Sequence, residues 1–226
     1  MIRKLVLVSL LPVVHLSAFF YQNKSIEERY QRLQKWCLFA FKILGLELVV
    51  KGAENIETSD SALLVSNHQG TIDPLLVISS YSSPMSFVSK SSNRKILGVG
   101  KWGELIEIIF FNRETKQGNI AMLRQATRML QSERSVLIFP EGTRSKSDTM
   151  QEFKTGALLP AMHAKADILP ITLNQSYAID TSEKIKKVTI TYHPKIEYKN
   201  YKDMDLQQLV DVVFNVIQSK IESNRV

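Results

Sequence analysis

One stretch of the sequence joins a buried strand to a helix through a loop that carries a histidine and a carboxylate. The apolar run at residues 62–65 is typical of a buried strand, and the apolar run at 75–78 is typical of a helix. Asp73 and Pro74 mark the start of that helix, because proline is favoured at the first helical position and restricts the residue before it. Asp73 is therefore predicted to be the N-cap of this helix.

His68 lies in this loop, five residues before Asp73. Gly70 would allow the loop to fold the histidine back over the start of the helix. The carboxylate could then hold one imidazole nitrogen and leave the other free to take a proton from a substrate hydroxyl. The alternative is that Asp73 only caps the helix and that His68 only fills a turn. The spacing alone leaves both interpretations open.

Apolar runs alternate with amphipathic segments along the rest of the chain. Strands are predicted at residues 46–50, 62–66, 86–90, 108–111, 135–139, 168–173 and 188–192. Helices are predicted at residues 26–44, 74–81, 118–132 and 205–223. This alternation predicts an α/β fold, with a mostly parallel central sheet flanked by helices and an N-terminal helical membrane-binding segment.

Charge and cysteine content narrow the classes of partner. The net charge of +7 and the pI near 9.4 favour an anionic partner: a phospholipid surface, a phosphorylated substrate or nucleic acid. Nucleic acid is disfavoured, because the positive charge is dispersed and no aromatic cluster is interleaved with cations. Cys37 is the only cysteine, which excludes an intrachain disulfide and gives no support to a cysteine-based zinc site. No metal is expected.

The N-terminal residues have the composition of a membrane anchor. Residues 5–21 are almost wholly apolar and approach the ~20 residues that a transmembrane helix needs. No convincing signal-peptide cleavage site follows, so we expect a retained anchor that either spans the membrane or lies in its interface. The helix at 26–44 is basic in its first half and apolar in its second, which favours insertion beneath lipid headgroups, although an ordinary core helix is the alternative. The predicted domains are residues 1–45, the anchoring helices, and 46–226, the globular body.

A second group of polar residues follows the strand at 135–139. Gly142 permits a tight turn there, and Thr143 and Arg144 can present hydrogen-bond donors. Arg113 also ends a predicted strand, and Lys154 lies a short distance downstream. Open α/β sheets place their sites at the carboxyl ends of strands, so these three cations could converge on a phosphate. The alternative for each cation is a solvated surface charge.

Taken together, these motifs resemble the 1-acyl-sn-glycerol-3-phosphate acyltransferase family of glycerolipid acyltransferases. The family's Asn-His-x4-Asp motif is present as Asn67, His68 and Asp73. Its Phe-Pro-Glu-Gly-Thr-Arg-Ser motif is intact at residues 139–145, and its Phe-Lys-x-Gly segment is at 153–156. Its arginine after a short apolar strand corresponds to Arg113, although Asn112 stands where an aspartate is common. The order and spacing match across about residues 46–175.

The resemblance implies transfer of a fatty acyl group from a thioester to a lipid hydroxyl without a covalent enzyme intermediate. His68 would be the general base and Asp73 would hold its tautomer. The substrate-binding residues would be Asn67, Arg113, Glu141, Gly142, Thr143, Arg144 and Lys154. Glu141 would order Arg144 or a glycerol hydroxyl, because a carboxylate beside a phosphate needs a partner. Backbone N–H groups are expected to stabilise the oxyanion of the tetrahedral intermediate.

The expected acceptor is 1-acyl-sn-glycerol-3-phosphate (lysophosphatidate), which would give phosphatidic acid. The alternative acceptors are another lysophospholipid, glycerol 3-phosphate or an amino-lipid, and a non-catalytic membrane-surface protein is an alternative of another class. The donor would be acyl coenzyme A or acyl carrier protein, which is a substrate, so no cofactor is expected. We expect the protein to bind a membrane surface, with its active site on the cytoplasmic face.

Overall fold

The computed structural model describes residues 2–56, 61–181 and 187–222. Its strands form a seven-stranded sheet in the order β1-β7-β6-β2-β5-β3-β4. Neighbouring strands are parallel, except for the antiparallel pair β6 and β7. The strands are β1 Glu47–Lys51, β2 Ala62–Ser66, β3 Met85–Lys90, β4 Ile109–Phe111, β5 Ser135–Ile138, β6 Asp167–Asn174 and β7 Lys187–Tyr192. The predicted α/β fold with a mostly parallel sheet is confirmed.

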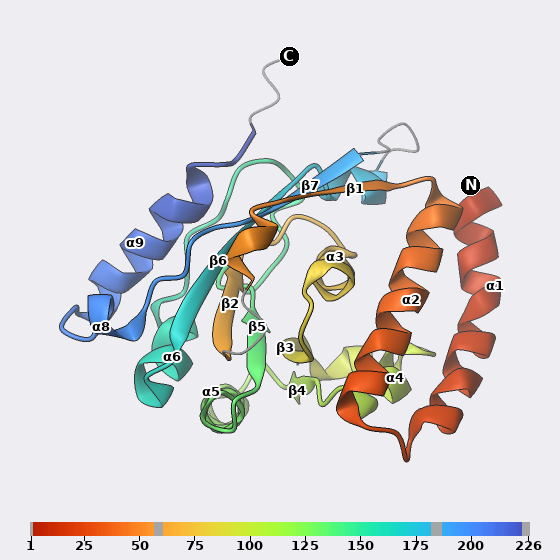
Figure 1. The fold of residues 1–226 in the computed structure, drawn as a ribbon, viewed down its shortest axis with the longest axis horizontal. Coiled ribbons are helices and arrows are strands. Elements are labelled where there is room, and N and C mark those ends of the chain that lie inside the picture. Colours follow the sequence, from red (N-terminus) through yellow and green to blue (C-terminus); the bar gives the residue numbers. More distant parts are fainter. Residues whose placement is uncertain (1, 57–60, 182–186, 223–226) are drawn as a thin grey trace.

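Helices cover both faces of this sheet (Figure 1). On one side lie α1 Ile2–Ser17, α2 Ile26–Leu44, α3 Asp73–Ser80 and α4 Val99–Leu105. On the other lie α5 Lys116–Gln131, α6 Leu159–Ala164 and α9 Leu206–Gln218. The remaining short helices are α7 Tyr177–Thr181, α8 Tyr198–Tyr201 and the 3₁₀ segments η1 Ala18–Tyr21, η2 Ala53–Asn55, η3 Ser91–Lys95 and η4 Thr155–Leu158.

The two layers follow from the alternation of side chains along the central strand. Ala62 and Leu64 of β2 pack into the cluster that contains α2 and α3, whereas Leu63 and Val65 pack into the cluster that contains α5 and α9. Successive residues of a strand point to opposite faces, and helices cover both faces of this one. All of β2 is consequently buried, which gives the loop after it a rigid base.

Most helix limits agree with local signals in the sequence. A capping box formed by Ser25 and Glu28 begins α2, and Gly45 ends it in the left-handed conformation at φ 68°. The predicted closing helix is too long, because α9 ends at Gln218, and residue 223 of that prediction lies outside the described residues. The predicted N-cap of α3 is also wrong: Ile72 occupies that position, and Asp73 is the first helical residue.

The N-terminal helices α1 and α2 run side by side in opposite directions, next to α3 and α4 (Figure 1). One face of α2 belongs to the core through Tyr30, Cys37 and Phe41, which are buried. Its opposite side leaves Leu38 and Phe39 about half exposed. Within the described residues, the helices are all too short or too polar to cross a bilayer.

Candidate active site

The candidate site lies at the carboxyl ends of neighbouring parallel strands. The loop that carries His68 follows β2, and the loop of residues 139–145 follows β5, which pairs directly with β2. The backbone N–H of Ser145 donates to the carbonyl of His68 at 2.8 Å, so the two loops are bonded to each other. This edge is where open α/β sheets hold their ligands.

His68 and Asp73 form a hydrogen-bonded pair. The distance from His68 Nδ1 to Asp73 Oδ2 is 2.8 Å, and the carboxylate is fully buried. The same oxygen accepts the backbone N–H groups of Gln69 and Gly70 at 2.6 and 2.9 Å. A carboxylate at Nδ1 favours the tautomer that carries its proton there, which leaves Nε2 as the basic nitrogen. The loop does fold His68 back onto Asp73, as the first of the two sequence interpretations requires.

Phe139 and Glu141 support the histidine from the neighbouring loop. The rings of His68 and Phe139 are stacked with centroids 4.2 Å apart. Glu141 Oε1 accepts the backbone N–H of His68 at 2.7 Å, and Oε2 accepts that of Gln151 at 3.0 Å. Burial raises the pKa of Glu141, although these two hydrogen bonds oppose the shift. The structure does not show Glu141 ordering Arg144. Arg144 is instead bonded to Thr71 and lies near Asp180, and the other alternative for Glu141, a glycerol hydroxyl, stays a prediction.

We expect Glu141→Ala to destabilise the protein by about 2–4 kcal/mol, because it leaves two backbone N–H groups without acceptors. The variant also removes the free-energy cost of burying the Glu141 carboxylate, but this gain offsets only part of the loss. Urea denaturation at neutral pH measures the difference, and the exposed neighbour Glu152→Ala is the matched control, with a change below about 0.5 kcal/mol. Equal stabilities of the two variants would show that Glu141 does not brace the loop.

Asn67, which was predicted to contact substrate, also has a bracing position. Its side chain is buried; Nδ2 donates to the carbonyl of Leu173 at 2.9 Å, and Oδ1 accepts the N–H of Leu173 at 2.8 Å. Both polar atoms of the amide are therefore bonded to β6. Asn67 fixes the start of the His68 loop on the neighbouring strand.

The predicted cations lie at this edge but do not meet at one point. Arg113 Nη1 donates to the carbonyl of Gly142 at 3.1 Å. Lys154 lies against the same glycine, since a Cβ added there would be 2.7 Å from Nζ. Arg144 instead donates to the hydroxyl of Thr71. Thr143, predicted to bind substrate, donates its hydroxyl to the side chain of Gln151 at 3.0 Å.

A cavity of about 390 Å³ lies next to Arg144. Its lining residues are Thr71, Arg144, Lys146, Tyr177 and Asp180. Only Arg144 among them is predicted from the sequence. Tyr177 and Asp180 lie on α7, beyond the recognised motifs, and no spacing in the sequence relates them to the His68 loop.

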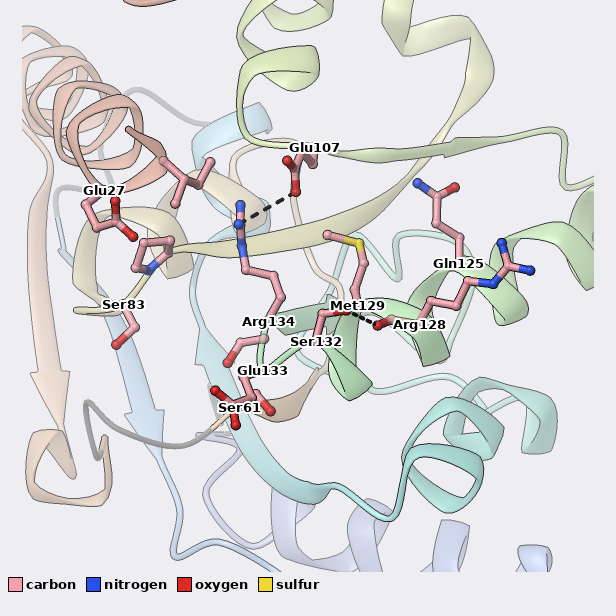
Figure 2. Close-up of a pocket in the computed structure, with 13 residues that line it drawn as sticks. Glu27, Ser61, Ser83, Glu107, Gln125, Arg128, Met129, Ser132, Glu133 and Arg134 are labelled. Carbon is pink, nitrogen blue, oxygen red and sulfur yellow. Dashed lines mark hydrogen bonds and ion pairs between the residues drawn. The ribbon is translucent and has the colours of Figure 1, made fainter. Parts of the chain in front are cut away.

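Another cavity, of about 690 Å³, lies at the opposite end of the strands, where β2, β3 and β5 begin (Figure 2). Ser61, Pro84 and Arg134, which line it, come directly before β2, β3 and β5. Figure 2 shows Arg134 reaching toward Glu107, and the closest distance between their charged atoms is 3.6 Å. Burial lowers the pKa of Arg134, and Glu107 opposes that shift. Since His68 follows β2, this cavity is remote from the His68–Asp73 pair.

For metals, the described ranges 2–56, 61–181 and 187–222 contain no group of three or more histidine, cysteine or carboxylate side chains that could hold an ion. The pair of His68 and Asp73 has the geometry of an acid–base arrangement, in which a carboxylate orients an imidazole.

Comparisons with known proteins agree with the sequence motifs. A family model described as Acyltransferase matches residues 47–174. A 1-acyl-sn-glycerol-3-phosphate acyltransferase of Borreliella burgdorferi is 27% identical over 188 residues, which cover 81% of this chain and 75% of that protein. A probable enzyme of the same name from Mycoplasma pneumoniae is 26% identical over 212 residues, covering 87% of this chain and 79% of the relative.

The fold has a close match among solved structures. The crystal structure of PlsC from Thermotoga maritima, described as a 1-acyl-sn-glycerophosphate (LPA) acyltransferase, superposes with a TM-score of 0.82. The match covers 97% of this chain and 91% of that chain, at 23% sequence identity. The match therefore includes the N-terminal helices as well as the sheet.

Proposed function

This chain belongs to the acyltransferase family, whose model matches residues 47–174 of its 226, and we propose that it transfers a fatty acyl group from a thioester to the hydroxyl of 1-acyl-sn-glycerol-3-phosphate. The product is phosphatidic acid. The pairing of His68 with Asp73 is the observation that carries the chemistry. The names of the relatives from Borreliella burgdorferi and Mycoplasma pneumoniae support the acceptor.

The proposed reaction needs one base and no protein nucleophile. His68 Nε2 takes the proton of the acceptor hydroxyl as its oxygen attacks the thioester carbonyl. The tetrahedral intermediate then collapses, the C–S bond breaks, and the departing thiolate takes the proton from the imidazolium. Asp73 keeps Nδ1 protonated and stabilises the imidazolium while it exists. The protein is returned unchanged, with an ester formed and a thiol released.

The phosphate of the acceptor is the group that the cations would hold. Arg144 lines the cavity beside the His68 loop, while Arg113 and Lys154 lie on the adjoining turn at Gly142. Arginine suits phosphate because its planar fork can donate two parallel hydrogen bonds. Binding the anionic end there leaves the glycerol hydroxyl to reach His68.

The test is an acyl-transfer assay of the purified full chain, with product identified by mass. Acyl coenzyme A and acyl carrier protein are each supplied with lysophosphatidate, another lysophospholipid, glycerol 3-phosphate or an amino-lipid. We expect the highest kcat/KM with lysophosphatidate. A higher value with another acceptor would replace the proposed substrate, and vesicle binding without transfer to any acceptor would favour a non-catalytic surface protein.

The proposal includes docking on the cytoplasmic surface of a membrane through the N-terminal helices. Large apolar side chains are exposed along α1 and η1, from 59% to 80% for Leu5, Val8, Leu16 and Phe20. Lys101 lies over the ring of Phe19, with Nζ 5.1 Å from its centroid, so a cation accompanies the apolar residues. An apolar patch with a cation beside it is suited to an anionic lipid interface, where acceptor and product reside.

We expect Phe20→Glu to weaken binding to vesicles by about tenfold or more, because burying one large apolar side chain contributes about 1.5–3 kcal/mol. Co-sedimentation with vesicles of phosphatidylcholine and phosphatidylglycerol measures the bound fraction. Ile120→Glu on α5 is the matched control, since its side chain is also exposed and lies on the opposite layer. Equal binding by the two variants would place the membrane contact elsewhere.

A further inference from the structure

The residues around the cavity beside Arg144 include a carboxylate that the proposed reaction does not use. Asp180 belongs to α7, six residues beyond the end of the matched family region at residue 174. It lines the cavity together with Arg144 and Lys146. A carboxylate at a phosphate-binding position is unfavourable unless it has a separate task.

Asp180 joins the His68 loop to Arg144 through one oxygen. Its Oδ2 accepts both the backbone N–H and the hydroxyl of Thr71, each at 2.9 Å. The hydroxyl of Thr71 in turn accepts a hydrogen bond from Arg144 Nη1, and that nitrogen lies 3.7 Å from Asp180 Oδ2. The arginine is therefore held by a neutral hydroxyl and a carboxylate at the edge of the cavity.

The residue before α7 is bonded to the same loop, so the position of Asp180 relative to that loop is fixed. Gln69 Oε1 accepts both the N–H and the hydroxyl of Ser176, at 3.2 and 3.3 Å. Gly70 packs so closely on Ser176 that a Cβ would lie 2.6 Å from its carbonyl oxygen. The loop that holds His68 and the helix that holds Asp180 thus form one braced unit.

The exposure of the ion pair argues that it orients the arginine and contributes little to stability. The side chains of Arg144 and Asp180 are 41% and 32% exposed, and ion pairs in such surroundings stabilise proteins weakly. A long, flexible side chain that is already ordered, however, loses less entropy when a ligand binds. A phosphate carries more negative charge than a carboxylate and can accept two hydrogen bonds from one guanidinium.

We propose that Asp180 is a positioning residue that holds Arg144 ready for the phosphate of the acceptor, which then replaces the carboxylate as the main partner of the guanidinium. This inference rests on the proposed function. It adds Thr71 and Asp180 to the acceptor site as the groups that hold its principal cation, and it explains the carboxylate beside the cavity.

The test is a double-mutant cycle with lysophosphatidate as acceptor. We expect Asp180→Ala to raise the KM for lysophosphatidate about 3- to 10-fold, because the phosphate must then bear the entropic cost of ordering one flexible side chain. The kcat should stay within about twofold of the wild-type value. In an Arg144→Gln background the same change should add almost nothing, because the group that it positions is gone. Asp211→Ala is the control, since this exposed aspartate on α9 has a side-chain partner in Gln207 but no link to the site.

The outcomes separate this inference from the function on which it rests. If the wild-type protein does not acylate lysophosphatidate, the proposed function fails whatever Asp180 does. Two outcomes would overturn only the positioning role. In the first, Arg144→Gln raises the KM but Asp180→Ala has the KM of the wild type. In the second, Asp180→Ala lowers kcat equally in both backgrounds. Should Asp180→Ala fold poorly, Thr71→Val decides: it removes the hydroxyl bridge, and an unchanged KM would refute the proposal.

Discussion

His68→Ala should lower kcat for acyl transfer by about 10²- to 10⁴-fold, which is the usual contribution of a positioned general base. The structure shows how this imidazole is held in place. Its Nδ1 is bonded to a fully buried carboxylate, and its ring is stacked on Phe139, so the imidazole is fixed by its surroundings. A substrate hydroxyl beside Nε2 would lose its base without a change in the pocket that binds the phosphate.

The experiment compares this variant with His163→Ala, in which an exposed histidine of α6 is removed. We expect the control to keep wild-type turnover. The KM for lysophosphatidate should change little in His68→Ala, because the proposed phosphate contacts are intact. A kcat within about threefold of the wild type would contradict the base mechanism, since even weak general-base catalysis exceeds that factor.

Arg144→Gln should lower kcat/KM for lysophosphatidate by about 10- to 100-fold, mainly through KM. Hydrogen bonds to charged groups contribute about 1.5–3 kcal/mol, and every 1.4 kcal/mol is a factor of ten. Glutamine keeps a polar side chain but is shorter and has no charge and no guanidinium fork. Steady-state kinetics with varied acceptor at saturating donor measure the effect.

The matched control is Arg124→Gln, which removes an exposed arginine from α5. It should retain the kcat/KM of the wild type and thereby exclude a general effect of net charge on binding to lipid surfaces. If Arg144→Gln behaves like this control, the phosphate is not held by Arg144. The turn at Gly142, which Arg113 and Lys154 both approach, would then be the alternative phosphate site.

Much of the fold was predictable because its signals are local. Nearby residues signal both ends of the helix at 26–44: Ser25 with Glu28 at the start and Gly45 at the end. The strands are visible as short apolar runs, and their alternation with helices predicts a parallel sheet. The closing helix was predicted too long because the apolar pattern continues beyond Gln218 without a proline or glycine to end it.

The sequence predicts where the candidate site lies, but it does not predict the role of every residue in it. Asn67 and Glu141 belong to motifs, and a polar residue in a motif can contact substrate or brace a loop. The choice depends on partners far away in the sequence: Asn67 is bonded to a residue 106 positions later, and Glu141 to one 73 positions earlier. Both side chains are buried with their acceptors used, so they brace the loops.

The sequence by itself determined the order of the strands and of the helices α2, α3, α5 and α9, the loop that contains His68 and Asp73, and the family to which the chain belongs. These depend on residue types at short, fixed separations, which local sterics and hydrogen bonding translate directly into structure. Only the tertiary structure decided that the two side chains meet, and that Asp180 is bonded to Thr71 across 109 positions. Such contacts form when the sheet brings the ends of distant segments together, and no local pattern encodes them.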